Sequence, residues 1–249
     1  LRFDVVEALQ KVRVSYAGPA NLLASGLDLA DPGPALKTSP IGRLELALLF
    51  ENLIPVYGLA GNEEAVGGIA GGEETIATGH YQVPCRVSGT LTLDGAIQKV
   101  QALGYRDHSW GPRRWQAPRY WRWVSGICDE RNVFVGWVTR VGGSRPPGNG
   151  MVLRDGRLSL VRAVDISSTY GPPPNYPETM NLTLRTDEGT TQVTGRVLAI
   201  VPLRHRREGT VARLAEAVCE YKLNGLKGFG FSEYHDLIED GVPVGMAEA

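Results

Sequence analysis

Short runs of alternating apolar and polar residues, separated by two-residue turn signals, constrain this sequence more than any other feature. Residues 90–100 place Asp94-Gly95 between two such runs, and residues 151–161 place Asp155-Gly156 in the same position. The pattern recurs at Asn224-Gly225. Asp-Gly and Asn-Gly favour type I′ turns, whose twist matches that of two antiparallel strands. We therefore predict β-hairpins at these three places.

Two further hairpins are expected around Glu188-Gly189 and around residues 129–132. Residues 39–50 open like a helix N-terminus at Ser39-Pro40, but their apolar residues alternate with period two, which favours a strand. Residues 211–218 are rich in helix formers and stay open between helix and strand, with strand favoured. Loops are expected at residues 18–40, 58–74, 142–150 and 170–177, and an exposed turn at residues 204–207.

The composition fits a protein of many short strands and turns. The chain has 31 glycines and 16 prolines among 249 residues, well above the roughly 12% that these residues reach in average proteins. Lys and Arg number 26 against 27 Asp and Glu, a formal net charge of -1. This balance argues against a nucleic-acid binder or a polybasic membrane-surface module. We predict an all-β protein with one or two barrels or sandwiches.

Several site types are absent from the sequence. Cys85, Cys128 and Cys219 are odd in number and far apart, so we expect small buried side chains rather than disulfides or a zinc site. The sequence lacks the motifs G-x-S-x-G, G-x-x-x-x-G-K-[ST] and H-E-x-x-H. No apolar run approaches the ~18 residues of a membrane helix. We expect no metal, no cofactor, no nucleic acid and no integral membrane segment. No signal peptide is visible, which favours a cytoplasmic location.

The densest polar and aromatic cluster is Gly-Tyr-Arg-Asp-His-Ser-Trp-Gly-Pro-Arg-Arg-Trp at residues 104–115. In an extended strand, Arg106, His108 and Trp110 share one face, and Tyr105 and Asp107 share the other. Glycine and proline follow, so the cluster lies near a strand end. Two interpretations remain open: a satisfied buried histidine among core tryptophans, or a lined cavity with titratable groups.

Further aromatic and titratable residues favour the lined cavity. His80 lies in a second strand. The residues that share one face of the last strand are Phe229, Phe231, Glu233 and His235. Glu233, placed among aromatic rings, is a candidate for a carboxyl group with a raised pKa because desolvation disfavours its charged form. A place at an exposed barrel edge would explain Glu233 equally well. Candidate ligand-binding residues are His80, Tyr105, Arg106, Trp115, Trp121, Trp123, Trp137, Phe229 and Phe231.

The segment Arg-Asp-His-Ser-Trp-Gly at residues 106–111 resembles the shared Asp-His-x-Trp-Gly mark of the AttH-like and carotenoid hydratase (hydroxyneurosporene synthase) superfamily. It is most similar to a branch with the pattern Gly-Tyr-Arg-(Asp/Glu)-His-Ser-Trp-Gly-x-Arg-x-Trp. That branch also carries His-Tyr, like His80-Tyr81, and closes on Gly-x-Gly-x-x-Glu-Tyr, like residues 228–234.

The resemblance implies two lipocalin-like antiparallel barrels or sheets side by side, in residues 1–100 and 101–249. It also implies strands before Leu1, so the first sheet is expected to be incomplete at its N-terminus. The motif would open the second barrel and face a hydrophobic cavity. Only Asp107, His108 and Trp110 carry over from the family's functional residues, and the downstream tyrosine and aspartate of the carotenoid hydratases have no clear equivalent.

The expected partner is a hydrophobic small molecule such as a terpenoid, steroid, carotenoid or polyketide. We expect a hydratase-like enzyme in which His108, assisted by Asp107, is the acid/base, Trp110 stabilises positive charge and Glu233 is a second acid. The alternatives are a non-catalytic carrier of a lipophilic ligand and a cyclase or Diels-Alderase. The oligomeric state is left open, with a homodimer as one option.

Overall fold

The computed structural model describes residues 1–59, 79–111, 115–143 and 147–247. Most of these residues lie in two antiparallel sheets, which confirms the expected all-β, lipocalin-like class. The chain divides into an N-terminal unit, residues 1–58 and 80–108, and a C-terminal unit, residues 59–79 and 109–249. The sequence-based boundary lies at residue 100, whereas the compact units divide inside a strand.

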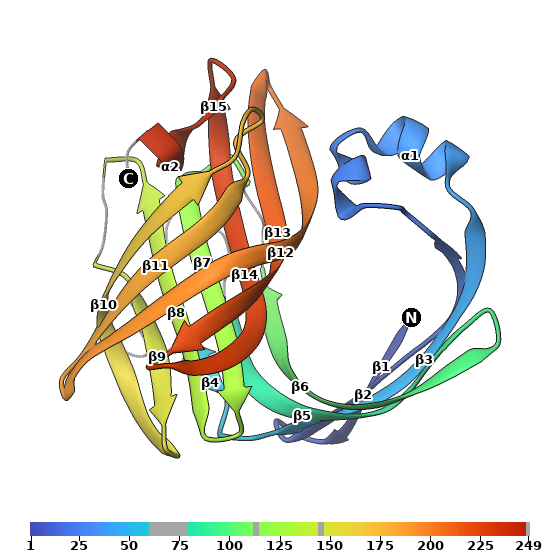
Figure 1. Ribbon diagram of the computed structural model, residues 1–249, viewed down its shortest axis with the longest axis horizontal. Coiled ribbons are helices and arrows are strands. Elements are labelled where there is room, and N and C mark those ends of the chain that lie inside the picture. The colour runs from blue at the N-terminus through green and yellow to red at the C-terminus, as the bar shows by residue number, and fades with distance from the viewer. Residues whose placement is uncertain (60–78, 112–114, 144–146, 248–249) are drawn as a thin grey trace. The chain divides into compact units, whose positions relative to one another are not determined.

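The N-terminal unit is one curved sheet with the order β1-β2-β3-β5-β4 and with β6 paired to β5. Figure 1 shows these strands curving around a concave side. The expected strand around Leu44 is confirmed within β3. The strands are β1 (Arg2–Glu7), β2 (Lys11–Asn21), β3 (Ile41–Asn52), β4 (Tyr57–Leu59), β5 (Gly79–Leu93) and β6 (Ala96–Trp110).

The segment between β2 and β3 differs from the expected loop of residues 18–40. β2 continues to Asn21, and two short helices follow, η1 (Gly26–Ala30) and α1 (Pro32–Thr38). Ser25 and Asp28 form a capping box at the start of η1, and a proline occupies the first turn of α1. These local signals stabilise short helices.

The C-terminal unit is an eight-stranded antiparallel barrel. Neighbouring strands pair in chain order from β7 to β14, and β14 also pairs with β7, which closes the barrel. A short β15 (Val242–Pro243) and α2 (Val244–Ala247) follow. The strands are β7 (Pro118–Asp129), β8 (Asn132–Val141), β9 (Asn149–Arg154), β10 (Arg157–Tyr170), β11 (Pro177–Thr186), β12 (Gly189–Arg207), β13 (Thr210–Leu223) and β14 (Leu226–Glu239).

The hairpin predictions are confirmed at Asp94-Gly95, Asp155-Gly156 and Asn224-Gly225, where both turn residues have positive φ. Glu208-Gly209 and Asp240-Gly241 form the same kind of turn and were not anticipated. In both, the φ of the glycine is near +80°, a conformation that glycine adopts without steric cost.

Two local expectations are corrected, and one, the strand favoured for residues 211–218, is confirmed. Residues 204–207 are not a turn but the end of β12, because the turn comes at the next two residues. The turn expected at Glu188-Gly189 lies one residue earlier, and Gly189 starts β12. Residues 211–218, left open between helix and strand, belong to β13. Most of the loop expected at residues 58–74 and part of that at 142–150 lie outside the described residues.

Candidate functional site

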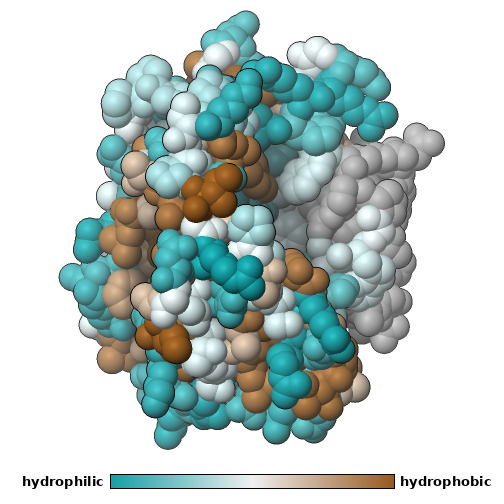
Figure 2. Space-filling view, turned by 90° about the vertical axis from the view of Figure 1, so that its right-hand side faces the viewer, coloured by the Kyte–Doolittle hydropathy of each residue, from teal (hydrophilic) through white to brown (hydrophobic). Residues whose placement is uncertain are grey.

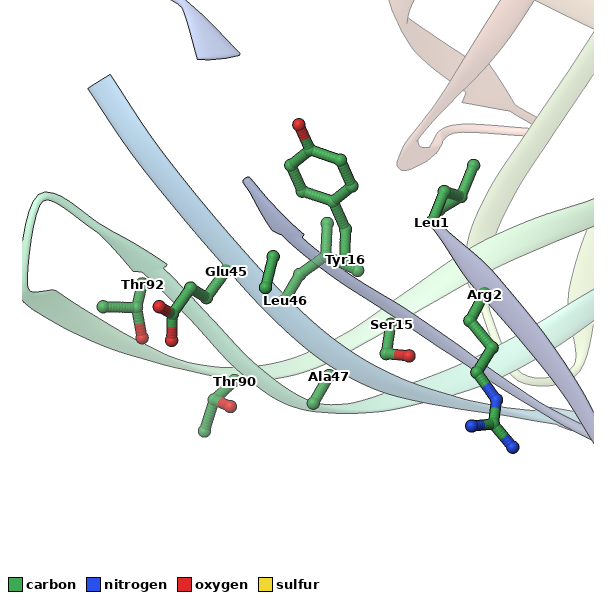
Figure 3. Close-up of a pocket in the computed structure, with 10 residues that line it drawn as sticks. Leu1, Arg2, Ser15, Tyr16, Glu45, Leu46, Ala47, Thr90 and Thr92 are labelled. Carbon is green, nitrogen blue, oxygen red and sulfur yellow. The ribbon is translucent and has the colours of Figure 1, made fainter. Parts of the chain in front are cut away.

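One side of the N-terminal sheet is apolar, and we call it the apolar face. Alternate residues of β5, namely Val83, Cys85 and Val87, are at most 5% exposed and pack with partly buried apolar residues of neighbouring segments: Leu48, Phe50, Ile54, Val56 and Val100. The register pairs Phe50 with Val87 and Tyr16 with Leu46, so the apolar face continues across β2 and β3. Tyr16 projects from the concave side of the sheet (Figure 3).

His108 and Arg106 lie on the apolar face near the end of β6. The His108 and Tyr81 rings stack with a centroid distance of 5.3 Å, and the Arg106 guanidinium carbon lies 5.7 Å from the Tyr81 ring centroid. A Cβ at Gly104 would meet Val87, so even-numbered residues of β6 face the same way as odd-numbered residues of β5. The expected alternation of the motif is therefore the observed one.

Arg106 makes its hydrogen bond with a neutral side chain. Its Nη2 donates to Oδ1 of Asn52 at 3.1 Å, and the thiol of Cys85 approaches the same oxygen at 3.6 Å. Burial raises the pKa of Cys85 to about 11, although the charge of Arg106 acts in the opposite direction. The thiol is therefore uncharged near neutral pH and does not neutralise the guanidinium.

The opposite face of the same hairpin carries a second imidazole. Asp107 contacts Nε2 of His80 through its carboxylate, not the neighbouring His108. The two histidines therefore lie on opposite faces of the sheet, because successive side chains alternate. Burial raises the pKa of Tyr105 on this face, and the Asp107 carboxylate acts in the same direction. The expectation that Asp107 assists His108 is corrected by this contact.

The tryptophans of the C-terminal unit do not line the barrel interior. Val124, Phe134 and Tyr234 belong to the barrel core, so the alternating Trp121 and Trp123 point outward from β7. Trp121, Trp137 and Leu214 form a second buried cluster, against which Trp115 and Trp123 pack. The expected aromatic grouping is observed, but on the outer surface of the barrel.

His235 and Glu233 of β14 join this outer cluster. His235 stacks on Trp121 with a centroid distance of 3.9 Å, and its Nε2 donates to the carbonyl of Trp115 at 2.8 Å. The indole N–H of Trp121 donates to Glu233. Burial lowers the pKa of His235 to about 3. His235 is therefore a neutral, structural imidazole at ordinary pH.

The remaining predicted residues are more exposed. Phe229 and Phe231 are 52% and 44% exposed on the outer surface of β14, and Trp110 is 39% exposed. A Cβ at Gly79 would collide with the indole of Trp110, so the glycine lets the ring lie against β5. Glu233 and His108 belong to different compact units, and each is placed by its own unit.

The barrel interior is occupied by side chains, among them a buried ion pair. Arg122 of β7 and Asp236 of β14 are 4% and 2% exposed and lie 2.9 Å apart. Burial opposes the charge of Arg122, but the Asp236 carboxylate, together with Tyr170 and Tyr234, outweighs this effect and raises the arginine pKa. The guanidinium also lies 4.5 Å from the ring centroid of Tyr234. The ion pair therefore lies among the core side chains of the barrel, and a pocket of about 320 Å³ lined by Val152, Arg154 and Thr191 lies elsewhere on the same barrel.

A shallow groove of about 420 Å³ crosses the other end of the N-terminal sheet. Ser15, Ala47 and Thr90 pair in register along it, and Arg2 and Glu45 flank them (Figure 3). Thr90 lies nine positions along β5 from Tyr81, roughly 30 Å in an extended strand. The groove is therefore separate from the site around His108.

Apolar side chains also reach the surface of the N-terminal unit. Leu1, Phe3 and Val5 are 65–77% exposed, the last two on β1. Figure 2 shows apolar residues lying between hydrophilic ones over the visible surface. In the part of the chain that the structure describes, no three or more His, Cys, Asp or Glu residues are grouped as metal ligands, and no helix has the length and apolarity to cross a membrane.

A family model for a domain of unknown function, DUF7064, matches residues 1–238. The chain belongs to this family. No curated protein sequence matches this DUF7064 member. Its fold is similar to the crystal structure of a "putative AttH" from Nitrosomonas europaea, with a TM-score of 0.61 and 16% sequence identity. The match covers 92% of this chain but only 66% of the other, so the chain spans less than two thirds of that protein. The expected AttH-like fold is supported.

Sequence reasoning missed four residues that this DUF7064 member places either beside Arg106 or in the ion pair of the barrel. Tyr81 and Asn52 contact Arg106, and Arg122 and Asp236 form the ion pair of the barrel. One of these, Tyr81, could have been predicted from the sequence. Counting strand positions outward from the Asp94-Gly95 turn places Tyr81 opposite His108, the pair that the structure stacks.

Proposed function

We propose that this protein binds an apolar small molecule on the apolar face of its N-terminal sheet and transforms it by acid/base chemistry at His108. The observation that carries the proposal is the exposed His108 imidazole, stacked on Tyr81 on the same face as the apolar cluster. Apolar surface with a few convergent polar groups is the usual form of a small-molecule site.

Hydration of a carbon-carbon double bond is the reaction we assign. An imidazolium gives a proton to one carbon, the oxygen of a water molecule bonds to the other, and the second proton of that water returns to the imidazole. The sum is addition of one water molecule, with the histidine regenerated. Imidazole suits both steps because its ordinary pKa lies near neutral pH.

His80 is the other histidine of this hairpin that could act as the acid/base. Its contact with Asp107 would also orient an imidazole, but it lies on the face opposite the apolar cluster. The proposal therefore gives His80 and Asp107 a positioning role in holding β5 and β6 together, and gives the chemistry to His108.

The test begins with the apolar molecule that co-purifies with the protein, identified by mass spectrometry. Incubation of that molecule and related alkenes in heavy-oxygen water then asks whether label enters the product. We expect label with the wild type, none with His108→Gln, and label at a reduced melting temperature with His80→Gln.

Three outcomes contradict the proposal. Unchanged labelling in His108→Gln would show that this imidazole is not the acid/base. Binding of the molecule without any chemical change would support the carrier, and rearrangement without label would support a cyclase.

A further inference from the structure

The guanidinium of Arg106 has fewer partners than its burial demands. Its Nη2 donates to Asn52 at 3.1 Å, and its carbon lies 5.7 Å from the Tyr81 ring centroid. The other two nitrogens, Nε and Nη1, are buried and have no hydrogen-bond partner in the described part of the chain. Guanidinium groups offer five N–H donors, and buried donors are nearly always satisfied in native proteins.

The charge of Arg106 also has no counter-charge among the residues that the structure describes. Burial keeps the Cys85 thiol neutral, and Asn52 carries no charge. Asp107 contacts His80 on the opposite face. Glu51 lies 3.2 Å from Lys11. Within the described ranges, no carboxylate forms an ion pair with Arg106. The Tyr81 ring attracts a cation but does not neutralise it.

We propose that Arg106 binds the carboxylate of a ligand whose apolar body lies over the apolar face. This rests on the proposed function and names the chemical class of its ligand, an apolar carboxylic acid. The ligand would supply the acceptor oxygens that Nε and Nη1 lack and the single negative charge that the guanidinium needs. A phosphate monoester carries close to two negative charges at neutral pH and would leave one unbalanced.

Neutralisation of the Arg106 charge by a bound carboxylate would also favour the proposed reaction. An unpaired guanidinium would oppose positive charge on a protonated alkene nearby. A bound carboxylate removes this opposition. Nε and Nη1 are enclosed, so the carboxylate reaches them when a covering side chain moves. Tyr81, which is partly buried and contacts both Arg106 and His108, is placed to do so.

Binding of dodecanoate and of dodecanol, each below its aggregation limit, tests the carboxylate site by calorimetry. We expect the wild type to bind dodecanoate about tenfold more tightly than dodecanol, as for a charge-assisted hydrogen bond. Arg106→Gln should remove this preference and leave dodecanol binding unchanged. Arg86→Gln, which removes an exposed positive charge from the opposite face of β5, is the matched control and should keep the preference.

A melting curve separates this assignment from a structural role. Loss of an unpaired buried charge should leave the melting temperature of Arg106→Gln equal to or above that of the wild type. A preference for dodecanoate that survives in Arg106→Gln, or its absence in the wild type, would overturn the carboxylate site. An Arg106-dependent preference for dodecanoate, together with no label in any alkene incubated in heavy-oxygen water, would uphold this site and refute the acid/base proposal. Failure of the wild type to bind either probe would refute both.

Discussion

His235 should make the C-terminal barrel sensitive to acid. The ring is fully buried, stacked on Trp121, and its Nδ1 has no hydrogen-bond partner. Burial lowers its pKa from 6.5 to about 3; the bond to the Trp115 carbonyl acts in the opposite direction, and the charge of Arg122 adds to the lowering. The folded barrel therefore holds a neutral imidazole at a pH where an unfolded chain holds a charged one.

The size of the effect follows from proton linkage. Above the unfolded pKa of about 6.5, both states are neutral and His235 contributes nothing to the pH dependence. Between about pH 6.5 and pH 3, only the unfolded state takes up the proton, so stability falls by about 1.4 kcal/mol for each pH unit. At about pH 5 the accumulated loss is roughly 2 kcal/mol.

Denaturant unfolding followed by tryptophan fluorescence measures this loss directly. All five tryptophans belong to the C-terminal unit, so their signal reports on the barrel. His235→Phe keeps an aromatic ring on Trp121 and removes the titrating group. It also loses the bond to Trp115, a constant cost of about 1 kcal/mol at every pH. Between about pH 7.5 and pH 5, the wild type should therefore lose roughly 2 kcal/mol more than His235→Phe.

A second variant, His205→Phe, tests whether removal of any histidine changes the acid sensitivity of the barrel. His205 lies near the same tryptophans, with its ring centroid 6.5 Å from that of Trp115, but its side chain is exposed. His205→Phe should keep the acid sensitivity of the wild type. Equal losses in the wild type and His235→Phe would refute the reasoning, because they would show that His235 is protonated with little penalty in the folded barrel.

Two further predictions concern the barrel core, and both are measured by the same unfolding assay. Arg122→Met should cost about 3–5 kcal/mol because it leaves Asp236 buried without its partner, while Arg122→Met with Asp236→Leu should recover most of that loss; a double variant as unstable as the single one would contradict this. Gly126→Ala should cost about 1–3 kcal/mol because the new Cβ meets the rings of Phe134 and Tyr221, the latter at 2.9 Å. Gly143→Ala, where nothing lies within 4 Å, should change stability by less than about 0.5 kcal/mol; equal costs at the two glycines would rule out the steric explanation.

The hairpins could be predicted because their signals are local. A type I′ turn requires positive φ at two successive residues, and Asp-Gly or Asn-Gly between two alternating runs favours this conformation. Asn149-Gly150, which is not placed between two such runs, lies inside β9 instead. The alternation of Arg106 and His108 against Asp107 followed from strand geometry alone. Together these patterns predicted the all-β class and placed Arg106, Asp107 and His108 on the hairpin that turns at Asp94-Gly95.

The partners across strands could not be predicted in the same way. Asp107 was expected to assist the histidine next to it in sequence, but neighbouring side chains of a strand point apart, and its contact is His80. The outward direction of Trp121 depends on which side of β7 becomes the barrel interior. That choice is made when β14 pairs with β7, more than 100 residues away in the chain.

The sequence by itself therefore determined where the chain turns and which side chains share a face, because both depend on a few neighbouring residues. Only the tertiary structure decided which face is buried and which charges are paired. Closure of the barrel encloses Arg122 with Asp236, and the packing of β3 against β5 sets Arg106 beside the neutral Asn52 and Cys85. Burial and charge neutralisation depend on what distant strands bring to a site, and no local pattern contains that information.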